Sequence, residues 1–248
     1  MVPKAVSTYW NASSAPRYSL LFALPLLLLY EALAAGLSGE PGAHLRNAAD
    51  IALKTPFLLV AGAKGSLAFF ATAIALCVFV VGRDISRNRG PLSPRVFGVM
   101  LAESAVLALL LGVVVGSLTQ RLLGLSLIAQ DGGSALAALD PATRLMLALG
   151  AGLYEELLFR VLLVGGIAAG LRWLLGGHRV AAGITAALVG ALIFSAFHYV
   201  GEYGDKLEVA SFTYRAIAGL AFSALYLTRG FGITAWTHAL YDVYVMVV

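Results

Sequence analysis

Three charged side chains lie inside an apolar stretch, "GLYEELLFRV", at residues 152–161. A charge at the centre of a membrane-spanning helix costs roughly 2.5–3.5 kcal/mol on insertion scales, so a chain keeps such groups for a purpose. Glu156 and Arg160 are four residues apart and would neutralise each other on one face of a helix. Glu155 is rotated by about 100° from that face and is left as an acid without a local partner. The alternative is a helix-packing ion pair with Glu155 reaching the membrane surface.

Two further apolar stretches carry a histidine. The segment "FSAFH" places Phe194 one helical turn before His198, and "HALYD" places His238 one turn before Asp242. A lone histidine within a membrane most often hydrogen-bonds to a neighbouring helix. A second histidine with an acid on its own face, beside an unpaired glutamate elsewhere, favours a shared hydrated site between helices.

These residues resemble the CAAX protease and bacteriocin-processing family, also called the Abi family, which includes the Rce1-type prenyl-protein endopeptidases. The family pattern is Glu-Glu-x-x-x-Arg, Phe-x-x-x-His and His-x-x-x-Asn or Asp, on separate membrane helices. The corresponding segments of this chain are 155–160, 194–198 and 238–242, within a resemblance that covers about 150–245. Two positions depart from the pattern. Val161 stands where the family often has glycine, which bears on local helix packing, and Asp242 stands where the prenyl-protein proteases have Asn, which argues against assuming a CAAX substrate.

The resemblance implies a glutamic-type intramembrane endopeptidase without a cofactor. Glu155 would be the general base, with His198 holding the same water molecule. His238, with Asp242, would face the developing oxyanion. Supporting roles outside the bond-making step would belong to Glu156, Arg160 and Phe194. The expected partners are the lipid bilayer and a membrane-associated peptide or protein, such as a CAAX protein, a bacteriocin leader or a sorting signal; the sequence indicates no oligomeric state.

Three alternatives stay open at this point. A zinc-dependent intramembrane protease is one, because Glu, two His and Asp form a plausible ligand set, although the sequence has no His-Glu-x-x-His. A non-catalytic immunity or scaffold protein is the second, and it predicts that Glu155→Ala leaves the phenotype intact. A proton-coupled transporter is the third, and detectable inverted repeats would favour it.

Membrane helices must position these side chains. The chain has 248 residues, of which 60% are hydrophobic and 12% charged, whereas a soluble domain is about 45–50% apolar and about 25% charged. We therefore expect an all-α fold, a polytopic bundle of about seven spans (six to eight), as one membrane domain over 1–248 with its motif-bearing core at about 143–248. The predicted spans are 18–37, 65–82, 96–117, 143–171, 180–199, 209–228 and 231–248.

Two segments near the N-terminus need separate interpretation. Residues 51–62 are too short to cross a bilayer and contain a Lys-Thr-Pro break, so they predict a short interfacial or re-entrant helix. The stretch 18–37 is expected to be a retained first span rather than a cleaved signal peptide. Glu31 and Glu103 stand alone in their spans and would line the site or stabilise helix packing.

The charged residues indicate how the chain is oriented. The formal net charge is only +4 and the basic residues fall mainly between spans, so membrane topology explains them better than nucleic-acid binding. The short loop "GRDISRNRGPLSPR" concentrates arginines, and "GEYGDKLE" is net acidic. We therefore expect an integral membrane protein, bacterial and of the inner membrane, with its N-terminus inside. The single cysteine, Cys77, excludes an intrachain disulfide.

Overall fold

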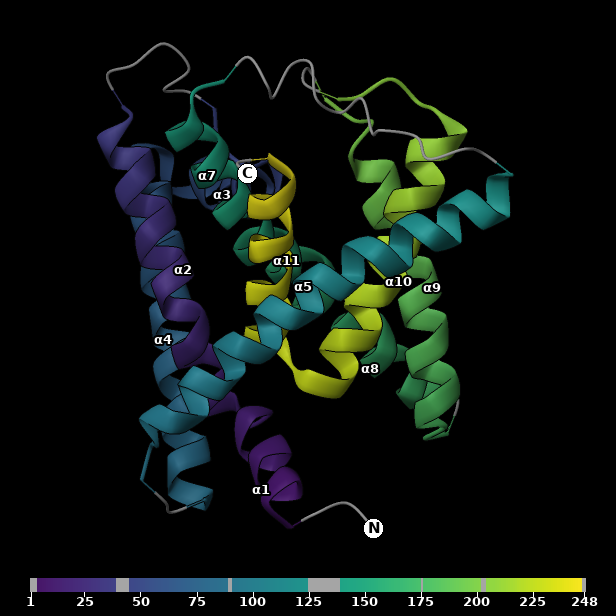
Figure 1. Ribbon diagram of the computed structural model, residues 1–248. Helices are drawn as coiled ribbons and strands as arrows, with labels where there is room; N and C mark the ends of the chain where they lie inside the picture. Colours follow the sequence, from purple (N-terminus) through teal and green to yellow (C-terminus); the bar gives the residue numbers. More distant parts are fainter. Residues whose placement is uncertain are drawn as a thin grey trace.

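The computed structural model describes residues 4–38, 45–88, 91–124, 139–174, 176–201 and 204–246, and this part of the chain contains helices and no strand. The all-α fold expected from composition is confirmed (Figure 1). The elements are α1 (Lys4–Ser13), α2 (Pro16–Gly36), α3 (Ala48–Ala61), η1 (Gly62–Lys64), α4 (Gly65–Arg87), α5 (Pro94–Leu123), α7 (Pro141–Gly150), η2 (Ala151–Val164), α8 (Gly165–Leu174), α9 (Arg179–Phe197), α10 (Val209–Arg229) and α11 (Phe231–Met246).

Local sequence signals set several of these boundaries. Helices α2, α5 and α7 each begin with a proline, whose fixed φ suits the first helical position. The side chain of Asp140 caps α7 by accepting from the backbone N–H groups of Ala142 and Thr143 at 2.9 and 3.0 Å. Together with the bond from the Thr143 hydroxyl, these contacts lower the pKa of Asp140, which lies just before the span. Gly230, at φ 80°, forms the sharp turn between α10 and α11.

Within the described residues, five helical segments are long and apolar enough to cross a membrane: Pro16–Gly36, Ala48–Arg87, Pro94–Leu123, Pro141–Leu174 and Arg179–Phe197. Their exposed surfaces are apolar, with Leu67 on α4 70% exposed and Val113 on α5 68% exposed. A soluble monomer rarely exposes such continuous apolar surface, whereas lipid chains cover it without cost. The chain is therefore an integral membrane protein with a polytopic helical bundle.

The last two predicted spans, 209–228 and 231–248, correspond to α10 and α11, which do not meet that criterion. Helix α11 has 16 described residues, and 247–248 lie outside the described part of the chain. Both helices carry polar side chains that lower their hydropathy. Helix α11 packs against α2, α5, α7, η2 and α10 (Figure 1). Its polar residues Thr234, Thr237 and His238 are buried in the protein and do not face lipid.

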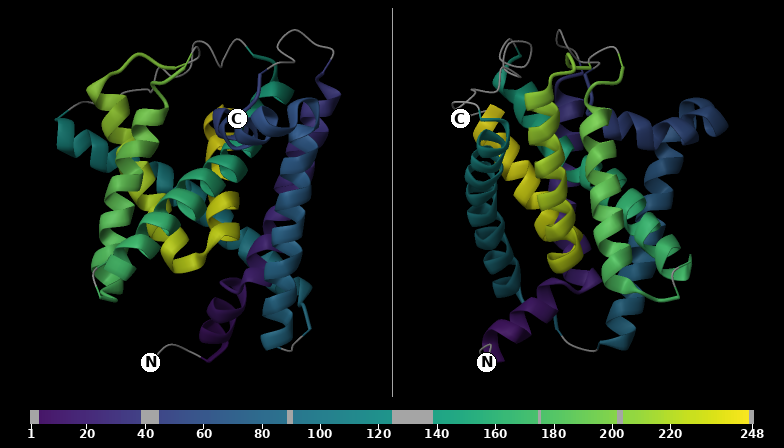
Figure 2. Two further views of the ribbon diagram at one scale, coloured as in Figure 1. Left: turned by 180° about the vertical axis from the view of Figure 1, so that it is seen from behind. Right: turned by 90° about the vertical axis from the view of Figure 1, so that its right-hand side faces the viewer.

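The short helix predicted at 51–62 is α3, which covers Ala48–Ala61. Gly62, at φ 53°, and the single turn η1 break the backbone between α3 and α4. Figure 2 shows α3 lying across the end of the bundle while α4 runs along it. Leu59 and Val60 at the far end of α3 are 83% and 90% exposed, whereas Asp50 and Lys54 nearer its start are buried. The prediction of a short helix at this place is confirmed.

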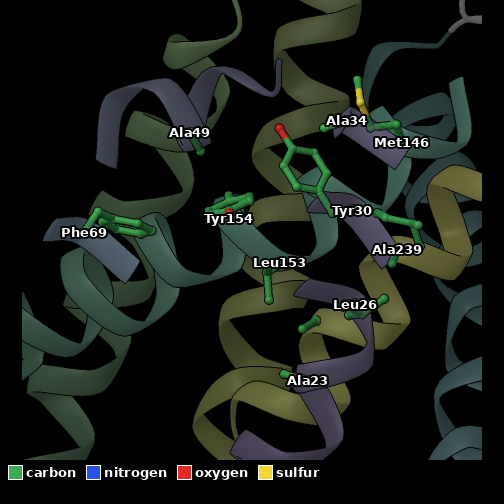
Figure 3. Packing of buried hydrophobic residues seen from close by; sticks show 12 residues of the cluster. Ala23, Leu26, Tyr30, Ala34, Ala49, Phe69, Met146, Leu153, Tyr154 and Ala239 are labelled. Carbon is green, nitrogen blue, oxygen red and sulfur yellow. The ribbon is translucent and has the colours of Figure 1, made fainter. Parts of the chain in front are cut away.

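One apolar cluster joins α2, α3 and η2. Tyr30 and Tyr154 lie edge to face at its centre, with ring centroids 5.1 Å apart (Figure 3). Leu26 and Met146 are also fully or almost fully buried there, at 0% and 2% exposure. This cluster fixes the N-terminal helices against the helix that carries the glutamate motif.

Candidate active site

The glutamate motif lies on η2, which is π-helical rather than α-helical. The backbone N–H of Gly165 at its end bonds to the carbonyl of Arg160, five residues back. The sequence predicted an α-helix here, whereas η2 has π-helical hydrogen bonds; the four-residue pair of Glu156 and Arg160 is nevertheless present, at 3.2 Å. Turns of the π type are rare and concentrate at functional sites. The widened helix buries Glu155, Glu156 and Arg160 at 8%, 0% and 1% exposure.

Two glycines bring η2 close to its neighbours. A Cβ atom on Gly152 would lie 2.5 Å from the carbonyl oxygen of Ala235 and 2.5 Å from the Cβ of Ala239, both on α11. A Cβ atom on Gly150 would lie 2.5 Å from the ring of Tyr30 and 3.0 Å from the Cβ of Asn47. Real side chains never pack so tightly, so glycine is required for the histidine helix and the start of α3 to reach the motif.

Glu155 lies between an amide and an imidazole. Its Oε1 accepts a hydrogen bond of 2.8 Å from the side-chain amide of Asn47, which directly precedes α3. Its Oε2 lies 4.0 Å from Nε2 of His198, at the end of α9. The other ring nitrogen of His198, Nδ1, is 2.9 Å from the carbonyl oxygen of Phe194, which fixes the ring and directs Nε2 toward Glu155. One oxygen of this carboxylate thus accepts a hydrogen bond from Asn47, and the other faces His198.

Glu156 has a different set of partners. Its Oε1 lies 3.2 Å from Nη1 of Arg160, the pair that the sequence spacing predicted. The same oxygen lies 2.6 Å from Nδ1 of His238 on α11. The sequence related His238 only to Asp242, whose Oδ2 is farther away, at 3.6 Å from Nε2 of His238. His238 therefore lies between two carboxylates.

Aromatic rings enclose these polar groups. Phe222 of α10 stacks on His238 with ring centroids 4.3 Å apart. Phe194 contacts the ring of His198 with centroids 4.8 Å apart and lies 4.2 Å from the guanidinium carbon of Arg160. Apolar walls exclude bulk water and strengthen electrostatic interactions inside the site.

The site leaves several polar atoms without hydrogen bonds. Among the described residues, none of the three guanidinium nitrogens of Arg160 has a hydrogen-bond partner, and neither has Oε2 of Glu156. Arg160 and Glu156 are thus close enough to form an ion pair, but the geometry of their contact is not that of a hydrogen bond. Most buried polar groups in proteins are paired with protein atoms or with water, so these atoms are available to water or to a bound substrate.

The structure thus brings together all seven sequence-predicted side chains, from η2, α9 and α11; the role of each stays a prediction. Two neighbours of the site did not emerge from the sequence. Phe222 lies in an ordinary apolar stretch, and nothing in the sequence around it indicates a place in the site. Asn47 precedes the predicted short helix, and its residue type marks it only as a helix cap.

The isolated acids lie in two other places. Glu31 accepts hydrogen bonds from Tyr154 and Lys54 at 2.7 and 3.1 Å, in a network beside the site. Glu103 pairs with Arg229 at 2.7 Å, away from the motif residues. Of the two expected roles, Glu31 therefore lies beside the site, and Glu103 stabilises helix packing.

The fold and the site together define an integral membrane protein with a buried centre of carboxylates and imidazoles. Residues 138–244 match the family model described as Rce1-like, type II CAAX prenyl endopeptidase. This part of the chain, which carries all three motifs, is therefore similar to the Rce1-like protease family, and the resemblance based on those motifs is confirmed. No curated protein and no solved structure matches the chain in the corresponding searches.

Proposed function

We propose that the chain is an intramembrane endopeptidase in which Glu155 activates the attacking water. The family match to 138–244 supports the class, a protease that acts on a membrane-associated peptide. The observation that carries the mechanism is the separation of 4.0 Å between Oε2 of Glu155 and Nε2 of His198. This distance is too long for a direct hydrogen bond and suits two groups that hold one water molecule between them.

The reaction uses the groups in turn. Glu155 takes a proton from the water as its oxygen attacks the peptide carbonyl carbon, and the carbonyl π electrons move onto the carbonyl oxygen. When the tetrahedral intermediate collapses, the C–N bond breaks and the proton held by Glu155 passes to the leaving amine. A positioned base typically contributes about 10²–10⁴-fold to the rate.

His238 stabilises the oxyanion through Nε2–H. The contact of 2.6 Å between Nδ1 of His238 and Glu156 supports this role, because the carboxylate holds the ring with Nε2 directed away from it. Asp242, at 3.6 Å from Nε2, either orients the ring or donates as a neutral acid. Loss of one oxyanion donor typically costs about 10²–10³-fold in rate. Arg160 and Phe194 hold these groups in place.

The chemistry proposed here needs no metal ion. Within the described ranges, no group of three His, Cys, Asp or Glu side chains is arranged so that it could hold one. The proposal places the protein in a bacterial inner membrane with its N-terminus inside. The substrate is a prenylated CAAX protein, a bacteriocin leader or a sorting signal, and Asp242 in place of Asn favours one of the latter two.

The test is cleavage by purified Glu155→Gln in detergent or liposomes, on quenched peptides that represent the three substrate classes. Glutamine has nearly the same shape, so we expect a folded protein whose cleavage is at least about 10²-fold slower. Glu208→Gln is the matched control, because Glu208 is exposed and directly precedes α10, outside the three motifs. A chelator should leave wild-type cleavage unchanged; inhibition reversed by zinc would instead support the metal alternative. Full cleavage by Glu155→Gln would overturn the proposal.

A further inference from the structure

We propose that Asn47 is a positioning residue that decides which oxygen of Glu155 acts as the base. This inference rests on the function proposed above. Asn47 lies outside the matched segment 138–244, so the family pattern does not include it. Its side-chain amide nevertheless donates to Oε1 of Glu155 at 2.8 Å, across 108 residues of sequence. Both residues are buried, each with 8% of its surface exposed.

The hydrogen bonds of Asn47 leave its amide a single orientation. Its Oδ1 accepts from the backbone N–H of Ala49 at 2.9 Å, which caps the start of α3. A cap requires an acceptor and a carboxylate requires a donor, so only an amide with its NH₂ toward Glu155 satisfies both. The cap that begins α3 therefore also aims a donor at the catalytic carboxylate.

Asn47 itself is held firmly. Its backbone N–H donates to the hydroxyl of Tyr30 at 3.3 Å, and that hydroxyl donates to Asp50 at 2.9 Å. Asp50 also pairs with Lys54 at 2.6 Å, which ties the first turns of α3 together. Gly150 leaves the room that Asn47 and Tyr30 occupy. The amide is thus fixed by α2, α3 and α7 rather than by its own side-chain preferences.

The consequence concerns the geometry of the base. Because Asn47 occupies Oε1, the carboxylate is held with Oε2 toward His198, 4.0 Å away. A neutral donor stabilises and orients the carboxylate without replacing it as a proton acceptor. The neighbouring Glu156 is instead paired with the charged Arg160 at 3.2 Å. The amide thus orients Glu155 without neutralising it, whereas the guanidinium neutralises Glu156.

Three substitutions separate the donor from the helix cap. Asn47→Ser keeps a capping oxygen and is too short to reach Glu155. Asn47→Gln keeps an amide donor and caps poorly. Asn47→Asp keeps the cap and places a like charge against Glu155. Asp140→Ser, a change of capping residue at α7 without any contact to Glu155, is the control.

We expect Asn47→Ser to fold normally and to lower kcat by about 10- to 100-fold with little change in KM, because a hydrogen bond to a charged group is lost. Asn47→Asp should be slower still. Asn47→Gln should be less stable but faster per folded molecule than Asn47→Ser. Asp140→Ser should match the wild type in kcat. A wild-type kcat in Asn47→Ser, or an Asn47→Gln variant no faster than Asn47→Ser, would overturn the inference.

A second readout does not depend on cleavage. Infrared difference spectra between the wild type and Glu155→Gln identify the carboxylate band of Glu155, and Asn47→Ser should shift that band. An unshifted band refutes the positioning role whatever the enzyme cleaves. A shifted band, together with full cleavage by Glu155→Gln, would refute the proposed function while leaving the contact between the two residues established.

Discussion

Among the described residues, two arginines are buried, Arg160 on η2 and Arg229 at the end of α10, and their surroundings differ. Arg229 donates from Nε and Nη2 to both oxygens of Glu103, at 2.7 and 2.8 Å, and from its Nη atoms to the hydroxyls of Ser13 and Ser14, at 2.8 and 3.2 Å. Trp10 covers its guanidinium, with the ring centroid 3.8 Å from the guanidinium carbon. This centre is a bidentate ion pair of the kind that fixes helices to one another.

Arg160 has one carboxylate at 3.2 Å and aromatic rings on its other sides, and its nitrogens make no hydrogen bond to any described residue. Buried donors without partners cost free energy, so a fold tolerates them where chemistry needs the space around them. The contrast predicts that changes at the Arg229 centre affect stability alone, whereas changes at the Arg160 centre also affect activity.

The largest effect is expected from Glu156→Gln. This change removes the charge that faces both Arg160 and His238, and breaking a buried ion pair costs about 3–5 kcal/mol. We expect lower thermal stability in detergent and a loss of cleavage of at least about 10²-fold per folded molecule, because His238 loses its orienting carboxylate. Glu155→Gln should lose cleavage alone. If both variants show the same stability and activity, the division between base and supporting carboxylate is wrong.

At the other centre, Glu103→Gln should lower the free energy of unfolding by about 3 kcal/mol, because it leaves Arg229 buried with only hydroxyl and carbonyl acceptors. Cleavage per folded molecule should stay at the wild-type level. The double variant Glu103→Leu with Arg229→Met removes both charges and should recover most of the lost stability. The test is to measure denaturation and cleavage on the same samples. Reduced cleavage by folded Glu103→Gln would contradict the prediction that the Arg229 centre affects stability alone.

A smaller effect is expected from Gly152→Ala. The added methyl group would meet Ala235 and Ala239 at 2.5 Å, so η2 and α11 must separate. Overpacking of this kind costs about 1–3 kcal/mol and would move His238 away from Glu156. Gly166→Ala, where an added Cβ meets nothing within 4 Å, is the control and should behave as the wild type. Thermal unfolding and cleavage rates of the two variants give the comparison.

The smallest effect is expected from Asp242→Asn. Asparagine keeps the shape and adds a donor, so cleavage should stay within about 10-fold of the wild type if Asp242 orients His238 or donates to the oxyanion. The measurement is cleavage rate together with bound zinc. An inactive, metal-depleted variant beside a zinc-loaded wild type would establish Asp242 as a metal ligand, since an amide is a poorer zinc ligand than a carboxylate.

The contacts within one helix followed from the sequence. Four-residue spacing placed Glu156 by Arg160 on η2 and Phe194 by His198 at the end of α9, and both contacts are present; the first is present although η2 is π-helical. The apolar stretches likewise predicted the helices, because hydrophobic length sets what a bilayer accepts. The first residues of the short helix were missed, since α3 begins at Ala48 rather than 51 and its capping residue is the one that reaches Glu155.

Contacts between helices were decided by the tertiary structure alone. His238 bonds to Glu156 more closely than it approaches Asp242, and Asn47 reaches Glu155 across 108 residues. Spacing along one helix fixes which side chains share its face, whereas the rotation and separation of two helices depend on packing over their whole length. Here that packing requires Gly150 and Gly152, whose missing side chains let α2, α3 and α11 approach the motif. The sequence therefore determined the chemical groups and their order, and the close packing of helices determined which of them act together.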